Sequence, residues 1–279
     1  QMGVFMPGVF SGFVYVSQVA SYLSSKTLLM SENTQREKNR LVDYKVHYQT
    51  DAEAIVDPQG LDPVRRASED RRMETLRRLL ELRPGERLLD IGCGSGWFGD
   101  RCHRHGIDVW AMDIGRSGVA GAKTRFPQAA TYQVGDLYFL PFATASFDAV
   151  VLSEVVEHLE DIDAALAEAR RVLRPGGRLL VSVPYRETIV DHLCIHCNQL
   201  TPANAHLHRF DEATLAAHFR RQKFAIREVH LMTNKLLELG GFPHFSARWP
   251  YAVWRLVDAL MNKVVRKPAF LCIVGANGV

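Results

Sequence analysis

The sequence predicts an α/β fold in which a doubly wound, mostly parallel sheet of seven strands carries helices on both faces. Short apolar segments alternate with amphipathic helical patterns over residues 82–231, and such alternation builds right-handed βαβ units. A glycine cluster directly follows the first of these segments, as in the ligand-binding turns of open α/β sheets. With 47% hydrophobic and 23% charged residues among 279, the composition is that of one folded core. It excludes wholesale disorder, a coiled coil and a multi-span membrane architecture.

The elements can be placed in order, beginning with a helix expected over Asp62–Leu82 that Pro84 and Gly85 end. Its arginines, Arg71 and Arg72 among them, are expected on a solvated face. Apolar and β-branched runs then predict the strands Arg87–Ile91, Asp108–Met112, Thr131–Val134, Ala149–Leu152, Arg178–Val183, Phe224–Leu231 and Ala269–Val274. Helical patterns begin at Trp97 and cover Ser117–Phe126, Ile162–Leu173 and Asp211–Arg221. A Pro175-Gly176-Gly177 turn precedes the fifth strand.

Two insertions interrupt the alternation, at 185–210 after strand five and at 232–267 between strands six and seven. We expect them to belong to a single domain over 41–279. The second insertion predicts an amphipathic basic helix over Pro250–Lys267. Its apolar positions Trp254, Val257, Leu260 or Met261, and Val264 are interleaved with Arg255, Lys263, Arg266 and Lys267. Such a helix either covers a core or rests on an anionic membrane surface.

Residues 1–40 are expected to be a leader that is flexible or makes a weak membrane contact. The uncharged stretch Val4–Leu23 is about long enough to span a bilayer, but polar residues dilute it and no basic region precedes it. Residues 1–29 could equally be sequence upstream of a start at Met30.

The net charge of +3 is too small to indicate DNA binding. Five scattered cysteines indicate a reducing, cytoplasmic compartment, with peripheral membrane association left open.

The strongest motif is Leu88-Leu89-Asp90-Ile91-Gly92-Cys93-Gly94-Ser95-Gly96-Trp97, an apolar strand that ends in an acid and alternating glycines. The glycines allow a tight turn and a close approach of the backbone to a ligand. Gly94 to Gly99 is also a literal G-x-G-x-x-G with Asp113 about 20 residues farther on, so an NAD-dependent oxidoreductase is an alternative. Asp90 would face a pyrophosphate badly but suits the amino end of S-adenosylmethionine. Charge complementarity therefore favours that cofactor.

Residues 82–231 resemble the class I S-adenosylmethionine-dependent methyltransferases, which have a Rossmann-like sheet. Asp90 to Gly96 is similar to the first motif of the family, and Met112-Asp113-Ile114 to the acid that takes the ribose hydroxyls. Gly135-Asp136-Leu137 resembles the adenine-binding motif, Ser146 to His158 the motif of the fourth strand, and Leu173 to Gly177 the turn before the fifth. The resemblance implies that the cofactor is bound by Asp90, Gly92, Cys93, Gly94, Gly96, Asp113, Ile114, Asp136, Leu137 and Ser153.

The acceptor class is read from the segment after the fourth strand, Ser153-Glu154-Val155-Val156-Glu157-His158. It lacks the Pro-Pro-aromatic box of amino-DNA methyltransferases, and it resembles quinone-biosynthesis and other small-molecule methyltransferases. We therefore expect methyl transfer to a hydroxyl or amine of a small, hydrophobic acceptor, in small-molecule biosynthesis. His158 is the candidate general base; packing beside the next helix is its alternative role.

Two other functions remain open. The Glu-x-x-Glu-His motif also resembles that of small-RNA 2′-O-methyltransferases, in which the motif and a further His bind a divalent metal. The other open function is that of a non-catalytic, membrane-associated protein that binds the cofactor.

In the first insertion, Cys194 and Cys197 have zinc-ligand spacing, and His206 or His208 could complete the site. Because a second C-x-x-C is absent, we expect a lid over the substrate pocket, with no metal, rather than a zinc site.

Overall fold

The computed structural model describes residues 43–52, 60–193, 198 and 200–278. The expected leader and both cysteines of the candidate zinc site lie outside the described residues. Within the described residues, no helix is both long and apolar enough to cross a membrane.

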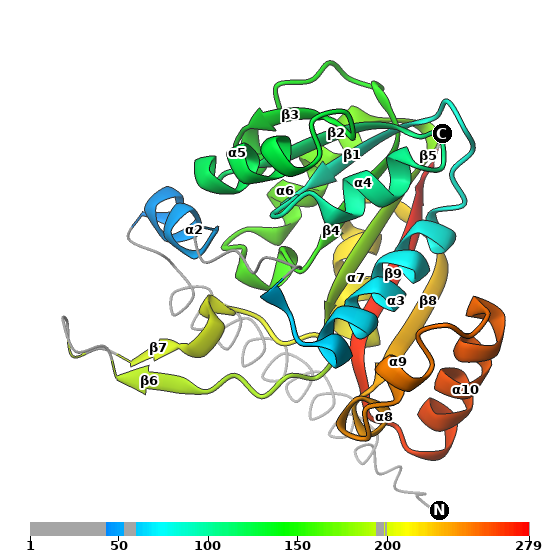
Figure 1. Cartoon of the computed structure of the whole chain (residues 1–279). Helices are drawn as coiled ribbons and strands as arrows, with labels where there is room; N and C mark the ends of the chain where they lie inside the picture. The colour runs from blue at the N-terminus through cyan, green and yellow to red at the C-terminus, as the bar shows by residue number, and fades with distance from the viewer. Residues whose placement is uncertain (1–42, 53–59, 194–197, 199, 279) are drawn as a thin grey trace, which may run out of the picture. The chain divides into compact units, whose positions relative to one another are not determined.

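The predicted seven-stranded α/β sheet is confirmed, with the strand order β3-β2-β1-β4-β5-β9-β8 (Figure 1). The strands are β1 (Arg87–Ile91), β2 (Asp108–Asp113), β3 (Thr131–Val134), β4 (Phe147–Ser153), β5 (Leu173–Pro184), β8 (Phe224–Asn234) and β9 (Pro268–Asn277). β1 pairs parallel with β2 and β4, whereas β9 runs antiparallel to both β5 and β8. The reversed strand β9 therefore leaves β8 parallel to β5, with both ending at the same edge of the sheet.

The central strands are buried on both faces, as parallel strands between two helix layers must be. Leu88, Leu89, Val150, Val151 and Leu180 are each fully buried. The helices are α3 (Pro63–Leu80), α4 (Trp97–His103), α5 (Arg116–Arg125), α6 (Ile162–Val172) and α7 (Glu212–Arg221). This continuous core fixes the carboxyl ends of β1, β2 and β4, where the candidate site lies.

The prediction that the arginines of α3 are solvated is wrong for Arg71 and Arg72, which are buried. The Arg71 guanidinium donates to the carbonyls of Ser246 at 2.8 Å and Trp249 at 2.8 Å. Arg72 donates to Glu69 at 2.7 Å and to Ser153 at 2.7 Å. The Arg71 charge is tolerated because carbonyls of a distant segment accept its hydrogen bonds, and the Arg72 charge because Glu69 on the same helix and Ser153 of β4 do. Helical periodicity cannot reveal the contacts with distant segments.

Strand β5 begins earlier than predicted, at Leu173, because Leu173 pairs with Phe147. The register then shifts to Ala149 opposite Arg178, so the expected turn at Pro175-Gly176-Gly177 bulges out of the ladder. The first insertion contains β6 (Asp191–Leu193) and β7 (Leu200–Pro202), paired as an antiparallel hairpin, and the short helix η4 (Ala203–Ala205).

The second insertion folds into α8 (Lys235–Leu239), α9 (Phe242–Phe245) and α10 (Tyr251–Val264). α10 is shorter than the predicted Pro250–Lys267, since Pro250 caps it and Val265 is extended. It packs on β8, with Trp254 and Asp258 buried. Val264, expected on the same apolar face as Trp254, is 80% exposed.

Candidate active site

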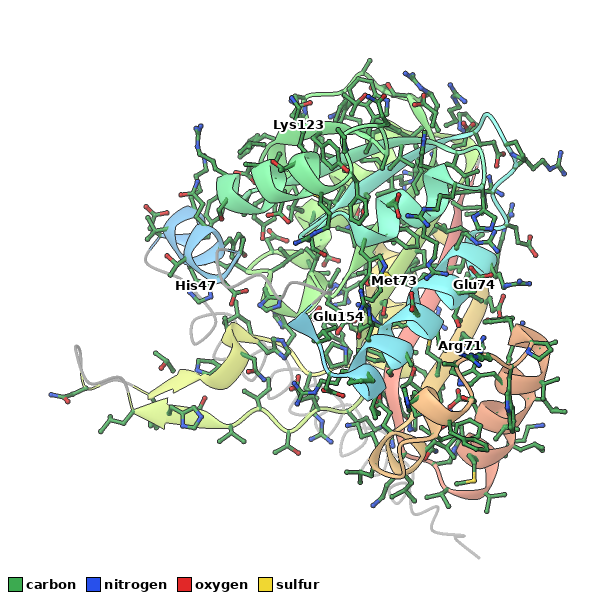
Figure 2. The ribbon with its side chains drawn as sticks, in the orientation of Figure 1. His47, Arg71, Met73, Glu74, Lys123 and Glu154 are labelled. Atoms are coloured by element: carbon green, nitrogen blue, oxygen red, sulfur yellow. The ribbon has the colours of Figure 1, made fainter. Side chains whose placement is uncertain are left out.

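A cavity lies at the carboxyl ends of β1, β2, β3 and β4, where open α/β sheets bind their ligands. The helix α2 (Tyr44–Ala52), which the sequence analysis did not predict, also contributes to its wall. Figure 2 shows His47 on this helix and Glu154 after β4. The lining residues are Tyr48, Asp51, Ala52, Ile91, Gly92, Gly94, Met112, Asp113, Ile114, Gly135, Asp136, Leu137, Glu154, Val155, His158 and Leu159.

The glycine turn after β1 forms one wall of the cavity. The backbone N–H of Gly92 donates to the carbonyl of Met112 at 2.8 Å, which ties the turn to β2. Gly92 has φ +75°, and a Cβ there would lie 2.3 Å from a methyl of Val155. A Cβ on Gly94 would meet no atom within 4 Å. The backbone at Gly94 therefore borders open space that a ligand can approach.

Asp113 at the end of β2 is held in one orientation by two loops. Its Oδ2 accepts from the backbone N–H of Gly94 at 2.9 Å, and its Oδ1 from that of Gly115 at 2.8 Å. Burial raises the pKa of this carboxyl, and these N–H groups oppose the rise. The carboxylate keeps further lone pairs with which it can accept hydrogen bonds from a ligand.

Asp90 lies at the end of β1, beneath the glycine turn. It is 3% exposed, and its Oδ2 has no hydrogen-bond partner among the described residues. Burial, reinforced by the charge of Asp113, raises the pKa of Asp90 to about 7. Its Oδ2 lies 4.0 Å from the position of a Cβ on Gly99, so it faces the start of α4.

α2 is tied to the cavity wall by two tyrosines. The Tyr44 hydroxyl donates to Asp136 Oδ2 at 2.8 Å, while Asp136 Oδ1 accepts from the backbone N–H of Tyr138 at 3.0 Å. The Tyr48 hydroxyl accepts from the backbone N–H of Glu160 at 2.7 Å. The candidate adenine-site carboxylate therefore already has partners, and a ligand there would share or displace Tyr44.

Titratable side chains gather around the short helix η3 (Val156–His158), whose His158 lines the cavity. Glu157 is 1% exposed, and neither carboxylate oxygen has a hydrogen-bond partner among the described residues. One ligand atom from each of Glu157, His158 and His206 lies within 4.8 Å of the others. Burial, with the charge of Glu154 second, raises the pKa of Glu157 well above its usual range. Such a carboxyl is either protonated or balanced by a cation.

His158 faces a carboxylate from α2. Its Nδ1 lies 3.3 Å from Asp51 Oδ2, and its ring meets that of His206 edge to face at 4.7 Å. Burial lowers the pKa of His158 to about 4, although Asp51 pulls it upward. His158 is therefore neutral near pH 7 and has a lone pair available for a proton or a metal ion.

Residues 89–181 match the family model described as a methyltransferase domain. A demethylmenaquinone methyltransferase of Beutenbergia cavernae is 43% identical over 103 residues, which cover 37% of this chain and 42% of that protein. A malonyl-[acyl-carrier protein] O-methyltransferase of Erwinia pyrifoliae is 44% identical over 109 residues, covering 38% and 41%. Residues 89–181 form a class I S-adenosylmethionine-dependent methyltransferase domain. The chain spans about two fifths of the length of these relatives.

Solved structures agree on the fold of the methyltransferase domain. An S-adenosylmethionine-dependent methyltransferase from Mesorhizobium loti superposes with a TM-score of 0.55 at 21% identity, covering 79% of this chain and 100% of that one. The [4+2]-cyclase SpnF superposes with a TM-score of 0.56 at 20% identity, covering 75% and 82%. At these identities the likeness shows the fold, and the fold alone does not decide the reaction.

The methyltransferase domain brings most of the predicted cofactor residues together. Those that line the cavity are Gly92, Gly94, Asp113, Ile114, Asp136 and Leu137, and His158 joins them. Asp90, Cys93, Gly96 and Ser153 do not line it in the described part of the chain. Cys93 is buried, Gly96 caps α4, and Ser153 accepts a hydrogen bond from Arg72.

Two residues of α2, Tyr48 and Asp51, were missed by the sequence analysis. Their only signal was the helical spacing of Tyr44, Tyr48 and Asp51, which is common by chance. Of the zinc candidates that are described, His208 donates to the carbonyl of Leu159 at 2.7 Å, and His206 lies beside His158 and Glu157. The described metal-type cluster is therefore built on the motif after β4 and on His206.

Proposed function

We propose that this chain transfers the methyl group of S-adenosylmethionine to a hydroxyl or amine of a small acceptor. The observation that carries the proposal is the pairing of two halves in one cavity. Gly92, Gly94 and Asp113 line one part of it, the cofactor half, and Glu154 and His158 line another, the acceptor half. A methyl donor held by the first half would point its reactive carbon toward an acceptor beside the second.

The cofactor half supplies groups of the right chemistry. Asp113 is fixed by two backbone N–H groups and would accept from the ribose hydroxyls. Gly94 leaves the backbone open to the ligand. Asp90 lies behind this wall as a buried carboxyl whose Oδ2 has no hydrogen-bond partner among the described residues, and we propose that it favours the positively charged end of the methionine moiety. S-adenosylmethionine carries its own activated methyl group, so alignment and exclusion of water are the main tasks of the protein.

His158 is the residue that we propose as general base, and Asp51 as the residue that positions it. A base must be unprotonated before it acts, and the lowered pKa of His158 keeps it so near neutrality. The Asp51 carboxylate, 3.3 Å from Nδ1, would stabilise the imidazolium that forms when His158 takes the proton.

The proposal is tested by incubating the purified chain with radiolabelled S-adenosylmethionine and two sets of acceptors. One set holds hydroxyl acceptors, including demethylated quinols, and the other holds matched amines. The sequence similarity to a demethylmenaquinone methyltransferase and to a malonyl-[acyl-carrier protein] O-methyltransferase supports adding a demethylmenaquinol and a malonyl thioester to these sets. We expect label in at least one acceptor and loss of that label in Asp113→Ala. Label in none of them, with the cofactor bound, would favour a non-catalytic binding protein.

A second candidate is metal-dependent methylation of a hydroxyl, of which RNA 2′-hydroxyl methylation is one form. The cluster of Glu157, His158 and His206 favours it, because two imidazoles and a carboxylate with an open position suit a catalytic divalent metal such as zinc. A cation there would also balance the unpartnered carboxylate of Glu157.

Calorimetric titration with Zn²⁺ or Mn²⁺ tests this candidate without any assay of activity. We expect one ion per chain, and Glu157→Gln or His206→Ala should weaken its binding by more than about tenfold. His244→Ala is the matched control, since His244 is an exposed histidine of α9. Weak binding that is equal in all four proteins would exclude the metal site and leave His158 as a simple base.

A further inference from the structure

The solvent-facing side of α10 is an apolar stripe. Val253, Leu256, Leu260 and Val264 are 45%, 60%, 52% and 80% exposed. Their spacing places them on one face of the helix. The packed face is a different one, and it carries Trp254 and Asp258. α10 is thus apolar on two faces: the face packed on β8, and the face that no described residue covers.

The exposed charges of the second insertion are of one sign. Residues 235–267 contain six basic residues, and all six are exposed: Lys235, Arg248, Arg255, Lys263, Arg266 and Lys267. The only two acids of this stretch are turned inward. Asp258 is buried and accepts from the backbone N–H groups of Thr233 and Asn234, and Glu238 accepts from Ser68. Within the described residues, none of the six basic groups lies in an ion pair. The outer charge of the insertion is therefore positive and unneutralised.

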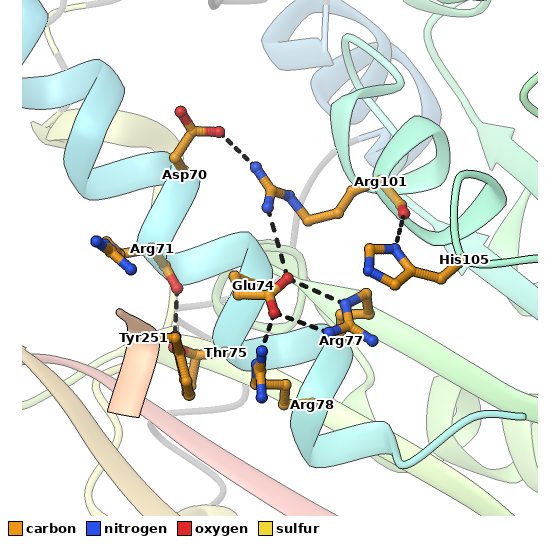
Figure 3. Close-up of polar contacts among 9 residues, drawn as sticks. All are labelled: Asp70, Arg71, Glu74, Thr75, Arg77, Arg78, Arg101, His105 and Tyr251. Atoms are coloured by element: carbon orange, nitrogen blue, oxygen red, sulfur yellow. Dashed lines mark hydrogen bonds and ion pairs between the residues drawn. The ribbon is translucent and has the colours of Figure 1, made fainter. Parts of the chain in front are cut away.

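The insertion is held rigidly against α3. The buried Arg71 donates to the carbonyls of Ser246, Ala247 and Trp249 and stacks on Trp254 at 5.6 Å. The Tyr251 hydroxyl bonds to Thr75 at 3.1 Å, as Figure 3 shows beside Arg71 and Arg78. The stripe is therefore present before any partner arrives, and little ordering entropy opposes its binding.

The insertion also begins at the edge of the sheet that carries the cavity. β8 is parallel to β1, β4 and β5 and ends at Asn234, where α8 starts. The cavity lies at the carboxyl ends of β1 and β4, so the start of the insertion lies at the same end of the strands as the cavity, with β5 and β9 between β4 and β8.

We propose that α10 docks the protein on an anionic lipid surface. In this docked state Val253, Leu256, Leu260 and Val264 lie at the boundary of headgroups and acyl chains, and Lys263, Arg266 and Lys267 face lipid phosphates. An apolar stripe alone would suit many partners. The uniformly positive surroundings select an anionic one, and a lipid surface accepts both features at once. Docking does not depend on methyl transfer. If the proposed function holds, it would place the enzyme where hydrophobic acceptors dissolve.

Co-flotation of the full chain with vesicles of phosphatidylcholine and phosphatidylglycerol tests this inference. We expect binding at low salt that weakens at high salt, and little binding to vesicles of phosphatidylcholine alone. Leu256→Gln with Leu260→Gln should lower the partition coefficient about tenfold, and Lys263→Gln with Lys267→Gln by a similar factor. All four side chains are exposed, so the thermal unfolding midpoints of these variants should match that of the parent chain.

The matched control removes two positive charges elsewhere, with Lys123→Gln on α5 and Arg220→Gln on α7. Both residues are exposed, and Figure 2 shows Lys123 at the opposite end of the molecule from α10. This variant should bind vesicles like the parent. Equal binding by all variants, or no binding by the parent at low salt, would overturn the proposal. Self-association without vesicles that Leu256→Gln with Leu260→Gln abolishes would overturn it too, in favour of a second copy of the chain.

Discussion

At the scale of single residues, the cofactor half of the cavity depends on Asp113. Its carboxylate joins the glycine turn after β1 to the loop after β2 through Gly94 and Gly115. Its remaining lone pairs are available to a ligand, because a carboxylate accepts up to about four hydrogen bonds. The residue thus shapes the wall and offers the ligand contact at the same time.

We predict that Asp113→Ala weakens binding of S-adenosylhomocysteine by about 1.5 to 3 kcal/mol, since charged hydrogen bonds to the ribose hydroxyls are lost. Calorimetry of the folded variant measures the change. Asp108→Ala is the matched control, because Asp108 starts the same strand but is exposed and paired with Arg87. Unchanged affinity in Asp113→Ala would remove the ribose assignment.

Asp90 predicts a pH dependence of stability. Burial and the charge of Asp113 raise its pKa from 3.8 to about 7. The folded state therefore holds this proton more tightly than the unfolded state. The contribution of Asp90 to the free energy of unfolding is greatest below about pH 4 and is lost as the pH rises to about 7. Asn stays neutral, so Asp90→Asn should be stabler than the parent at about pH 8 by roughly 2 to 4 kcal/mol, and less so at about pH 4.

Urea unfolding of the protein without ligand at several pH values measures this difference. The same substitution should weaken S-adenosylmethionine binding, because the negative charge behind the cofactor wall is lost. Stability curves that run parallel for both proteins across this pH range would show that Asp90 does not titrate there.

At the scale of elements, α2 is the segment that links the proposed cofactor half of the cavity to the proposed base. Tyr44 bonds to Asp136 beside the cofactor half, and Asp51 faces His158 on the acceptor half. The two residues lie on one helix, so both sides of the cavity depend on where α2 sits.

We predict that Asp51→Asn lowers kcat while the KM for S-adenosylmethionine changes little. The Asp51 charge raises the pKa of His158, so its removal should move the acidic limb of the kcat profile to lower pH. Asp43→Asn is the control, because Asp43 is exposed and an asparagine can still accept from the backbone at the start of the helix. An unshifted pH profile in an active Asp51→Asn would remove Asp51 from this role.

The elements also show what the sequence could predict. β1 and β3 have the predicted bounds because short apolar runs between turn residues fix both ends of a strand. α2 was missed because it has little amphipathic pattern and is held by Tyr44 and Tyr48 through contacts with distant residues. α10 was predicted with the wrong boundaries and with Val264 on the packed face, since periodicity does not say which of two apolar faces is covered.

At the scale of the whole molecule, the parallel sheet collects the site. Gly92, Asp113, Asp136 and Glu154 lie at or just after the ends of four different strands, and the shared direction of those strands brings them to one edge. That gathering could be predicted from motif order alone. The approach of His206 and Asp51 to His158 could not, because both come from segments outside the alternating pattern.

The central claim is that this edge binds S-adenosylmethionine rather than a nicotinamide cofactor. Calorimetric titration of the full chain with S-adenosylhomocysteine and, separately, with NADH tests it most directly. We predict one S-adenosylhomocysteine per chain, bound at least about tenfold more tightly than NADH, because the buried carboxylate of Asp90 disfavours a pyrophosphate. Tighter binding of NADH than of S-adenosylhomocysteine would contradict the account.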